Sequence, residues 1–216
     1  VAKVDKVVME VVSPDNIVSE MKAGNYDIAS MPSSQYEAFK DLTNVTFLSS
    51  EASAYEYIGF KLGKFDETTG KNVTDPNAKM ADVNLRQAMA YALDIDAAGQ
   101  NLYNGLQHAS NSIIIPFFND IHNKDQEGFT YNPEKAKQLL DEAGYKDVNG
   151  DGYREDKNGK PFEIKMAFMA GGDVAEPLAQ NYIQSWKKIG IKAVLTSGRL
   201  LAFQNFYEKV EGDSKD

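Results

Sequence analysis

Strand-like apolar runs alternate with amphipathic helical patterns along this chain, and several of the helical patterns end at a glycine. The clearest case is a strand pattern over residues 162–169, a helix pattern over 174–189, Gly190, and a second strand pattern over 191–195. Elements in this order form a crossover, which places two parallel strands in one sheet. Because no linker or internal repeat divides the chain, we expect a single α/β domain over residues 1–216.

The same periodicities predict the remaining elements. We expect further strands over residues 4–12, 26–29, 45–48 and 55–62. We expect further helices that begin at Ser13, at Ser33 or Ser34, and near residues 85, 96, 132 and 200. Residues 63–80 are rich in Gly, Asn, Asp and Thr, which is typical of a surface loop.

Charge and cysteine content exclude several classes of protein. The formal net charge of −9 argues against a nucleic-acid partner, which requires clustered Lys and Arg, and against adhesion to anionic lipid. The chain has no cysteine, so disulfides, Cys-ligated zinc and thiol nucleophiles are excluded. No apolar run approaches the roughly 20 residues that a membrane-spanning helix requires.

No motif indicates catalysis. The two histidines, His108 and His122, stand apart from any H-E-x-x-H pattern, and the chain has neither a phosphate-binding glycine loop nor a G-x-S-x-G elbow. The 32 carboxylates include no pair that spacing sets apart as an acid and base. We therefore assign no catalytic residue.

One segment resembles the start of an EF-hand calcium loop. Oxygen-bearing residues stand at loop positions one, three and five, glycine at six, and a backbone carbonyl at seven would complete the set. The candidate ligands are Asp147, Asn149, Asp151, the carbonyl of Tyr153, and Glu155 or Asp156 in a shortened loop. Position twelve is Asn158 rather than the usual Glu, so the pattern is incomplete. The alternative is a polar turn that forms without metal, which Asn-Gly and Asp-Gly pairs favour.

A second loop, Gly171-Gly172-Asp173, lies between a predicted strand and a predicted helix. Such a loop can hold an anion at the helix N-terminus. The alternative is a tight turn in which Asp173 caps the helix.

Six segments in order resemble the peptide/nickel-binding family of extracellular solute-binding proteins, the capture components of ABC importers. They are AGNYDIA at 23–29, YEYIGF at 55–60, NLRQAMAYALD at 84–94, NPEKAKQLLDEAGY at 132–145, NGDGYR at 149–154 and WKKIGI at 186–191. Each motif alone is weak evidence, but together they extend over most of the chain. The resemblance is to the C-terminal lobe of the family's two-lobe fold.

The resemblance implies a class II periplasmic-binding-protein lobe, with a mixed, mostly parallel sheet and helices on both faces. The chain would be a fragment comprising most of that lobe. An oligopeptide would be enclosed between two lobes and delivered to the permease subunits of the transporter. The protein would be a monomer that needs no cofactor, with calcium at most structural. It would be extracytoplasmic, either a Gram-positive cell-surface lipoprotein or periplasmic.

The position of one loop predicts part of the binding site. Open α/β sheets bind ligands beyond the carboxyl ends of their strands. The loop formed by Ala170, Gly171, Gly172 and Asp173 directly follows the strand pattern at 162–169. The resemblance places peptide contacts in the same loop, and Tyr55, Tyr57 and Arg199 are further candidates.

Two alternatives to peptide capture remain open. Within the family, the ligand could instead be a signalling peptide, a nickel chelate or a sugar. Outside it, an α/β hydrolase or transferase would share the fold class, because fold alone does not determine function.

Overall fold

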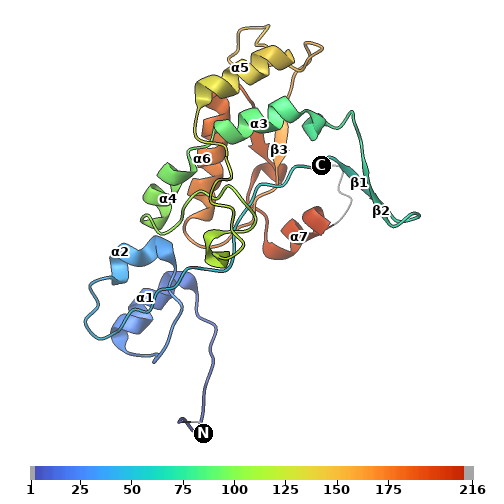
Figure 1. The fold of residues 1–216 in the computed structure, drawn as a ribbon. Helices are drawn as coiled ribbons and strands as arrows, with labels where there is room; N and C mark the ends of the chain where they lie inside the picture. Colours follow the sequence, from blue (N-terminus) through green and yellow to red (C-terminus); the bar gives the residue numbers. More distant parts are fainter. Residues whose placement is uncertain (1–2, 212–216) are drawn as a thin grey trace. The chain divides into compact units, whose positions relative to one another are not determined.

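The computed structural model describes residues 3–211, and the chain divides into two compact units, Val1–Ser49 and Ser50–Asp216 (Figure 1). The prediction that residues 1–216 form most of one lobe of a larger protein stays a prediction.

The first unit is built around one helix, α1 (Pro14–Ala23). Pro14 occupies its first turn, and Gly24 ends it in the left-handed conformation with φ 75°, as the sequence predicts. A 3-10 turn, η1 (Ser33–Gln35), leads into the short helix α2 (Tyr36–Phe39). Ile17, Met21 and Phe39 are the buried side chains of this unit.

The strands predicted over 4–12, 26–29, 45–48 and 55–62 do not form among the described residues. In the first unit their apolar side chains are exposed, with Met9 at 90%, Ile28 at 91% and Leu48 at 95%. A strand needs a neighbouring backbone to receive its hydrogen bonds, and β propensity alone does not supply one. In the second unit, the segment 55–62 does not form a strand either, although Ile58, Phe60 and Leu62 pack against the core.

Between residues 50 and 211, five helices form in the second unit, close to the predicted ranges. They are α3 (Val83–Tyr91), α4 (Ile95–Tyr103), α5 (Pro133–Ala143), α6 (Ala175–Lys188) and α7 (Phe203–Glu211). Side chains cap three of them, since Asp82, Asp94 and Asn132 accept hydrogen bonds from backbone N–H groups in the first turns of α3, α4 and α5. Helix α7 begins three residues later than predicted, because Leu201 is paired with Met169 in a parallel bridge.

Short 3-10 turns connect these elements. They are η2 (Lys79–Ala81), η3 (Pro116–Phe118) and η4 (Thr196–Gly198).

In the part of the chain that the structure describes, two small sheets accompany the helices. Strands β1 (Gly63–Asp66) and β2 (Lys71–Thr74) form an antiparallel hairpin within the range predicted as a surface loop. Gly63 lets these strands approach, because a Cβ there would lie 2.0 Å from the Val73 carbonyl oxygen. Strands β3 (Ile164–Met166) and β4 (Ala193–Leu195) are parallel, with Ile164 opposite Ala193. Helix α6 connects them, which confirms the predicted crossover.

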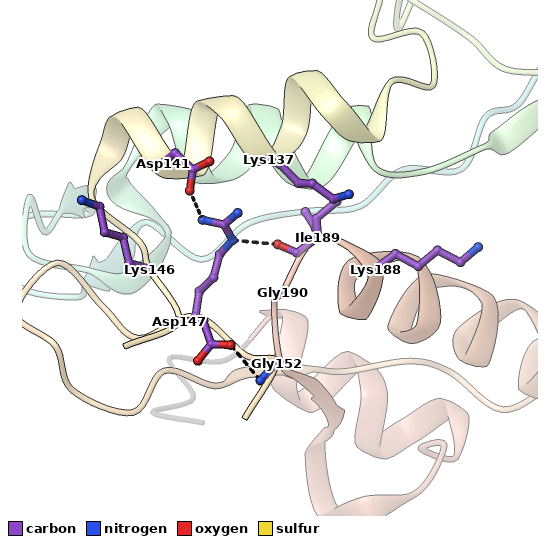
Figure 2. A pocket seen from close by; sticks show the side chains of 9 residues that line it. Lys137, Asp141, Lys146, Asp147, Gly152, Lys188, Ile189 and Gly190 are labelled. Atoms are coloured by element: carbon purple, nitrogen blue, oxygen red, sulfur yellow. Dashed lines mark hydrogen bonds and ion pairs between the residues drawn. The ribbon is translucent and has the colours of Figure 1, made fainter. Parts of the chain in front are cut away.

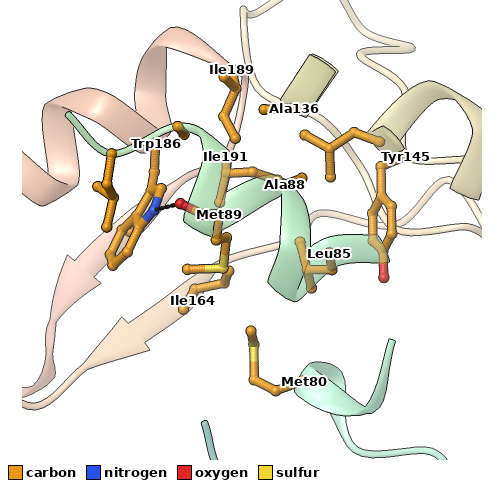
Figure 3. Packing of buried hydrophobic residues seen from close by; sticks show 14 residues of the cluster. Met80, Leu85, Ala88, Met89, Ala136, Tyr145, Ile164, Trp186, Ile189 and Ile191 are labelled. Atoms are coloured by element: carbon orange, nitrogen blue, oxygen red, sulfur yellow. Dashed lines mark hydrogen bonds between the residues drawn. The ribbon is translucent and has the colours of Figure 1, made fainter. Parts of the chain in front are cut away.

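The core of the second unit centres on Trp186 of α6 (Figure 3). Leu85 of α3, Leu140 of α5, and Ile189 and Ile191 after α6 are all at most 1% exposed. The indole N–H of Trp186 donates a buried hydrogen bond of 3.0 Å to the carbonyl oxygen of Met89, 97 residues away. The last carbonyls of a helix have no intrahelical partner, so this bond supplies one at the end of α3.

The carboxylate of Asp82 connects the start of α3 to residues beyond α5. It accepts hydrogen bonds from the Asn84 N–H at 2.9 Å and the Tyr145 hydroxyl at 3.1 Å, and it pairs with Lys157 at 2.5 Å. Burial opposes its ionisation, but the hydrogen bonds from Lys157 and Asn84 outweigh that effect and lower the pKa of Asp82. Burial, followed by the charge of Asp82, raises the pKa of Tyr145.

We predict that Trp186→Phe lowers the free energy of unfolding by roughly 1–3 kcal/mol, because it leaves the Met89 carbonyl buried without its partner. Urea denaturation measures this change. Tyr182→Phe is the matched control, because the Tyr182 ring packs in the same cluster and its hydroxyl makes no hydrogen bond among the described residues. Equal stability of the two variants would contradict the role given to the indole N–H.

Candidate functional site

The loop Ala170–Asp173 lies at the carboxyl end of the strand that contains β3, as predicted. The strand direction continues beyond β3, since Met169 pairs with Leu201 in a parallel bridge. The N–H of Ala170 donates to the Leu201 carbonyl oxygen at 2.7 Å, and the N–H of Leu201 donates to the Phe168 carbonyl oxygen at 2.8 Å. The loop therefore starts from a fixed position at the sheet edge.

The loop itself is open to an approaching molecule. Ala170, Gly171, Gly172 and Asp173 are all exposed. A Cβ built at Gly171 or Gly172 would meet no atom within 4 Å, and Gly172 has φ 62°, a conformation that favours glycine. The N-cap of α6 is Val174, which makes no side-chain cap hydrogen bond, so Asp173 is not the N-cap that the turn alternative assumed.

A small apolar cluster supports this loop. Tyr103 at the end of α4 is 8% exposed and packs with Ala98 and Leu178. Phe168 and Val174, on either side of the loop, pack against the same cluster. The loop is therefore flanked on both sides by partly buried side chains that pack in this cluster.

Two carboxylates lie close enough to Tyr103 to act on its hydroxyl. Burial raises the pKa of Tyr103, and the charges of Glu56 and Asp173 add to this effect. Burial raises the pKa of Tyr182 to about 12, with Glu56 again contributing. No motif or spacing in the sequence pointed to Glu56 or Tyr103.

The other predicted site residues are exposed. Tyr55 is 44% exposed and Tyr57 is 77% exposed, and their rings lie 6.1 Å apart. Arg199 is exposed with an extended backbone, two residues before the Leu201 that bonds to the loop. Their part in a binding site stays a prediction.

The predicted calcium loop is a series of hydrogen-bonded turns. Asp147 accepts the N–H groups of Gly150 and Gly152 at 2.7 and 2.8 Å. The side-chain oxygen of Asn149 accepts the Asp151 backbone N–H, and the Asp151 carboxylate accepts the Tyr153 backbone N–H, both at 2.8 Å. These bonds account for the loop conformation without a metal ion.

Glu155 accepts hydrogen bonds from two residues of this loop. Its side chain is 5% exposed and accepts the Val148 N–H at 2.8 Å and the Asn149 side-chain N–H at 2.6 Å. Within residues 3–211, no three His, Asp or Glu side chains are grouped so that they could hold a metal ion. Calcium at Asp147, Asn149, Asp151, Tyr153 and Glu155 therefore stays a prediction.

A pocket of about 430 Å³ lies where α5 and α6 end, and Asp147 and Gly152 of this loop are among the residues that line it (Figure 2). Its main feature is Arg154, whose guanidinium donates to Asp141 at 2.5 Å, to the Tyr145 carbonyl at 2.6 Å and to the Ile189 carbonyl at 2.9 Å. A Cβ at Gly190 would lie 2.9 Å from the Arg154 Cγ, so glycine makes room for this side chain. Arg154 serves the fold here, because it satisfies carbonyls at two helix ends.

We predict that Glu155→Gln in the presence of EDTA lowers the free energy of unfolding by roughly 1–3 kcal/mol, because the amide cannot accept both hydrogen bonds. Thermal melts measure this change, and Glu127→Gln, at an exposed carboxylate, is the control. An unchanged melting temperature would contradict the role of Glu155. The same melts with calcium test the metal, since an ion that binds only the folded protein raises the melting temperature.

Comparison with known proteins identifies the family. The family model for "Bacterial extracellular solute-binding proteins, family 5 Middle" matches residues 1–213. The oligopeptide-binding protein OppA of Lactococcus lactis subsp. cremoris is 36% identical over 208 residues, which are 95% of this chain and 34% of that protein. The oligopeptide-binding protein AppA of Bacillus subtilis is 30% identical over 190 residues, 87% of this chain and 32% of that protein.

Solved structures support the same relationship. Lactococcal OppA, complexed with an endogenous peptide in the closed conformation, matches with a TM-score of 0.83 and 36% identity. The match covers 91% of this chain and 37% of that one, so the chain spans about a third of the length of these relatives. This likeness confirms the predicted α/β, class II periplasmic-binding-protein-like fold. The chain belongs to the bacterial extracellular solute-binding proteins of family 5.

Proposed function

We propose that this chain is most of the C-terminal lobe of a two-lobe solute-binding protein that captures oligopeptides for an ABC importer. The observation that carries this proposal is the 36% identity and TM-score of 0.83 to lactococcal OppA, whose structure holds a peptide. The AppA relative is also named for oligopeptide binding. The predicted loop Ala170–Asp173 agrees with this function, because it is exposed and lies at the carboxyl end of a strand.

The proposed mechanism is binding without chemistry. An extended peptide offers backbone N–H and C=O groups that pair with exposed backbone, and this recognises peptides without reading each side chain. Gly171 and Gly172 let a peptide backbone approach the loop closely. Closure of two lobes would then enclose the ligand and present a new surface to the permease. The protein acts as a binding component and not as an enzyme.

The cellular setting follows from the family. Its members are described as extracellular solute-binding proteins, which supports an extracytoplasmic location for this one. We propose a monomer that is anchored as a lipoprotein or free in the periplasm. It requires no cofactor, and any calcium in the 147–155 loop is structural. Throughout the described part of the chain, no helix combines the length and apolar character needed to cross a membrane.

A second ligand class has support from one comparison. NikZ of Campylobacter jejuni, in complex with Ni(L-His), matches with a TM-score of 0.71 and 26% identity. The greater identity to OppA favours peptide over a nickel chelate. Calorimetric titration of the same protein with a peptide mixture and with nickel-histidine separates the two ligands.

We predict that Gly172→Val, placed in the longer protein that contains this chain, weakens peptide affinity by about tenfold or more, because a branched side chain blocks the loop. Calorimetry measures the affinity. Gly159→Val is the matched control, since Gly159 has φ 73° and open space around it, but lies in a distant turn. Unchanged affinity in a folded Gly172→Val protein would remove this loop from the site.

We predict that residues 1–216 alone bind peptides with a Kd weaker than about 1 µM, because only one side of the proposed cleft is present. Calorimetry with a mixed peptide library measures this, with the longer protein titrated in parallel. Circular dichroism establishes that the shorter chain is folded. Tight binding by residues 1–216 would show that the second lobe is not needed.

A further inference from the structure

The pocket where α5 and α6 end has a charge opposite to that of the whole chain. Its volume is about 430 Å³, and four cationic side chains line it together with two carboxylates. The lining is therefore positive, whereas the chain has a formal net charge of −9. Its cationic residues are Lys137, Lys146, Arg154 and Lys188. A concave place lined by one sign of charge concentrates ions of the other sign, here anions.

Arg154 has hydrogen-bond donors that the fold leaves unused. A guanidinium donates from Nε and from both Nη atoms. In Arg154, Nε donates to the Ile189 carbonyl oxygen, and Nη1 donates to Asp141 and to the Tyr145 carbonyl oxygen. Within residues 3–211, Nη2 donates no hydrogen bond. The side chain is only 13% exposed, but Nη2 is not one of the fully buried unsatisfied atoms, so its donors reach the accessible space of the pocket.

The lysines around the pocket are also available to a ligand. Lys146 and Lys188 are exposed and form no ion pair within the described part of the chain. Lys137 pairs with Glu134 at 2.9 Å, but Glu134 is 79% exposed, and an exposed pair of this kind contributes little. Figure 2 shows Lys137 and Lys188 on one side of the pocket and Lys146 on the other. Their flexible side chains can reach a ligand that lies between them.

The carboxylates of the lining already have partners. Asp141 is paired with Arg154 at 2.5 Å, and Asp147 accepts the N–H groups of Gly150 and Gly152. The C-terminal end of a helix ordinarily repels an anion. Here Arg154 satisfies carbonyl oxygens at both helix ends, which reduces this repulsion. The unpaired charge that remains in the pocket is therefore positive.

We propose that this pocket binds a phosphate group, at a site separate from the loop Ala170–Asp173. The loop leads into the first turn of α6 and the pocket lies at its last, so roughly 20 Å of helix separates them. The inference goes beyond peptide capture and does not depend on it.

The arrangement of the donors favours phosphate over carboxylate. A phosphate dianion has oxygens that a guanidinium and several ammonium groups can reach from different sides. A carboxylate has a single charge and two oxygens along one edge, which leaves lysines on the far side of the pocket without a partner. The phosphate belongs either to a free anion or to a lipid headgroup, and the residues that bind it are the same.

Calorimetric titration of the longer protein with inorganic phosphate tests the site, with sodium chloride keeping the ionic strength constant. We expect saturable binding of phosphate and none of acetate, which supplies the carboxylate control. Sedimentation with phosphatidylglycerol vesicles tests the headgroup, and phosphatidylcholine vesicles are the control. Binding of phosphate without retention on vesicles identifies a free anion, and retention on phosphatidylglycerol alone identifies a headgroup. If neither phosphate nor vesicles bind, the proposal is overturned.

Variants of the longer protein assign the binding to the pocket. We expect Lys188→Gln to weaken phosphate binding by about fivefold, and a second change, Lys146→Gln, to weaken it further. Lys187→Gln is the matched control, because Lys187 is the exposed neighbour on α6 and does not line the pocket. Circular dichroism checks that each variant is folded. Equal effects of Lys187→Gln and Lys188→Gln would show a general attraction between charges and overturn the site.

Discussion

The hydrogen bond from Trp186 to the Met89 carbonyl holds the second unit together at its centre. Trp186 is 1% exposed and stands on α6, the crossover helix between β3 and β4. The bond satisfies a carbonyl in the last turn of α3, so the packing of α6 against α3 is specified by a directional contact as well as by apolar area. Because the loop 170–173 leads into α6, its position depends on this contact.

Arg154 plays a comparable part where α5 and α6 end. Its guanidinium donates hydrogen bonds to the carbonyl oxygens of Tyr145 and Ile189, and its backbone N–H donates to the Gly190 carbonyl oxygen at 2.7 Å. A positive charge at two helix C-termini is favourable, since the helix dipole is negative there. The segments NGDGYR and WKKIGI, which stand far apart in the sequence, meet at this side chain and at the glycine that makes room for it.

The predicted binding loop is built differently from the core. Its residues are exposed and its glycines have open space, while the side chains on either side are packed. A binding site of this kind needs a rigid support and an accessible backbone, and it needs no reactive group.

Local patterns in the sequence determined the helices, because their caps and stop signals act within a few residues. Helix α1 begins at Pro14 and is ended by Gly24, and Asn132 is the N-cap of α5, as expected. The crossover of β3, α6 and β4 followed from the same periodicities, and the ordered motifs identified the family. The single strands were less predictable, since an apolar run such as 4–12 forms a strand only where another backbone receives its hydrogen bonds.

The site was predictable only in part. The position of the loop Ala170–Asp173 followed from the strand before it, whereas Tyr103 and Glu56 carry no local signal. Packing places Tyr103, at the end of α4, in one cluster with Phe168 and Val174 on either side of the loop, although they are distant in the sequence. Burial raises the pKa of the Tyr103 hydroxyl, and the charges of Glu56 and Asp173 add to this effect. Only the tertiary structure could decide this, because burial and proximity are properties of the packed chain and not of any single segment.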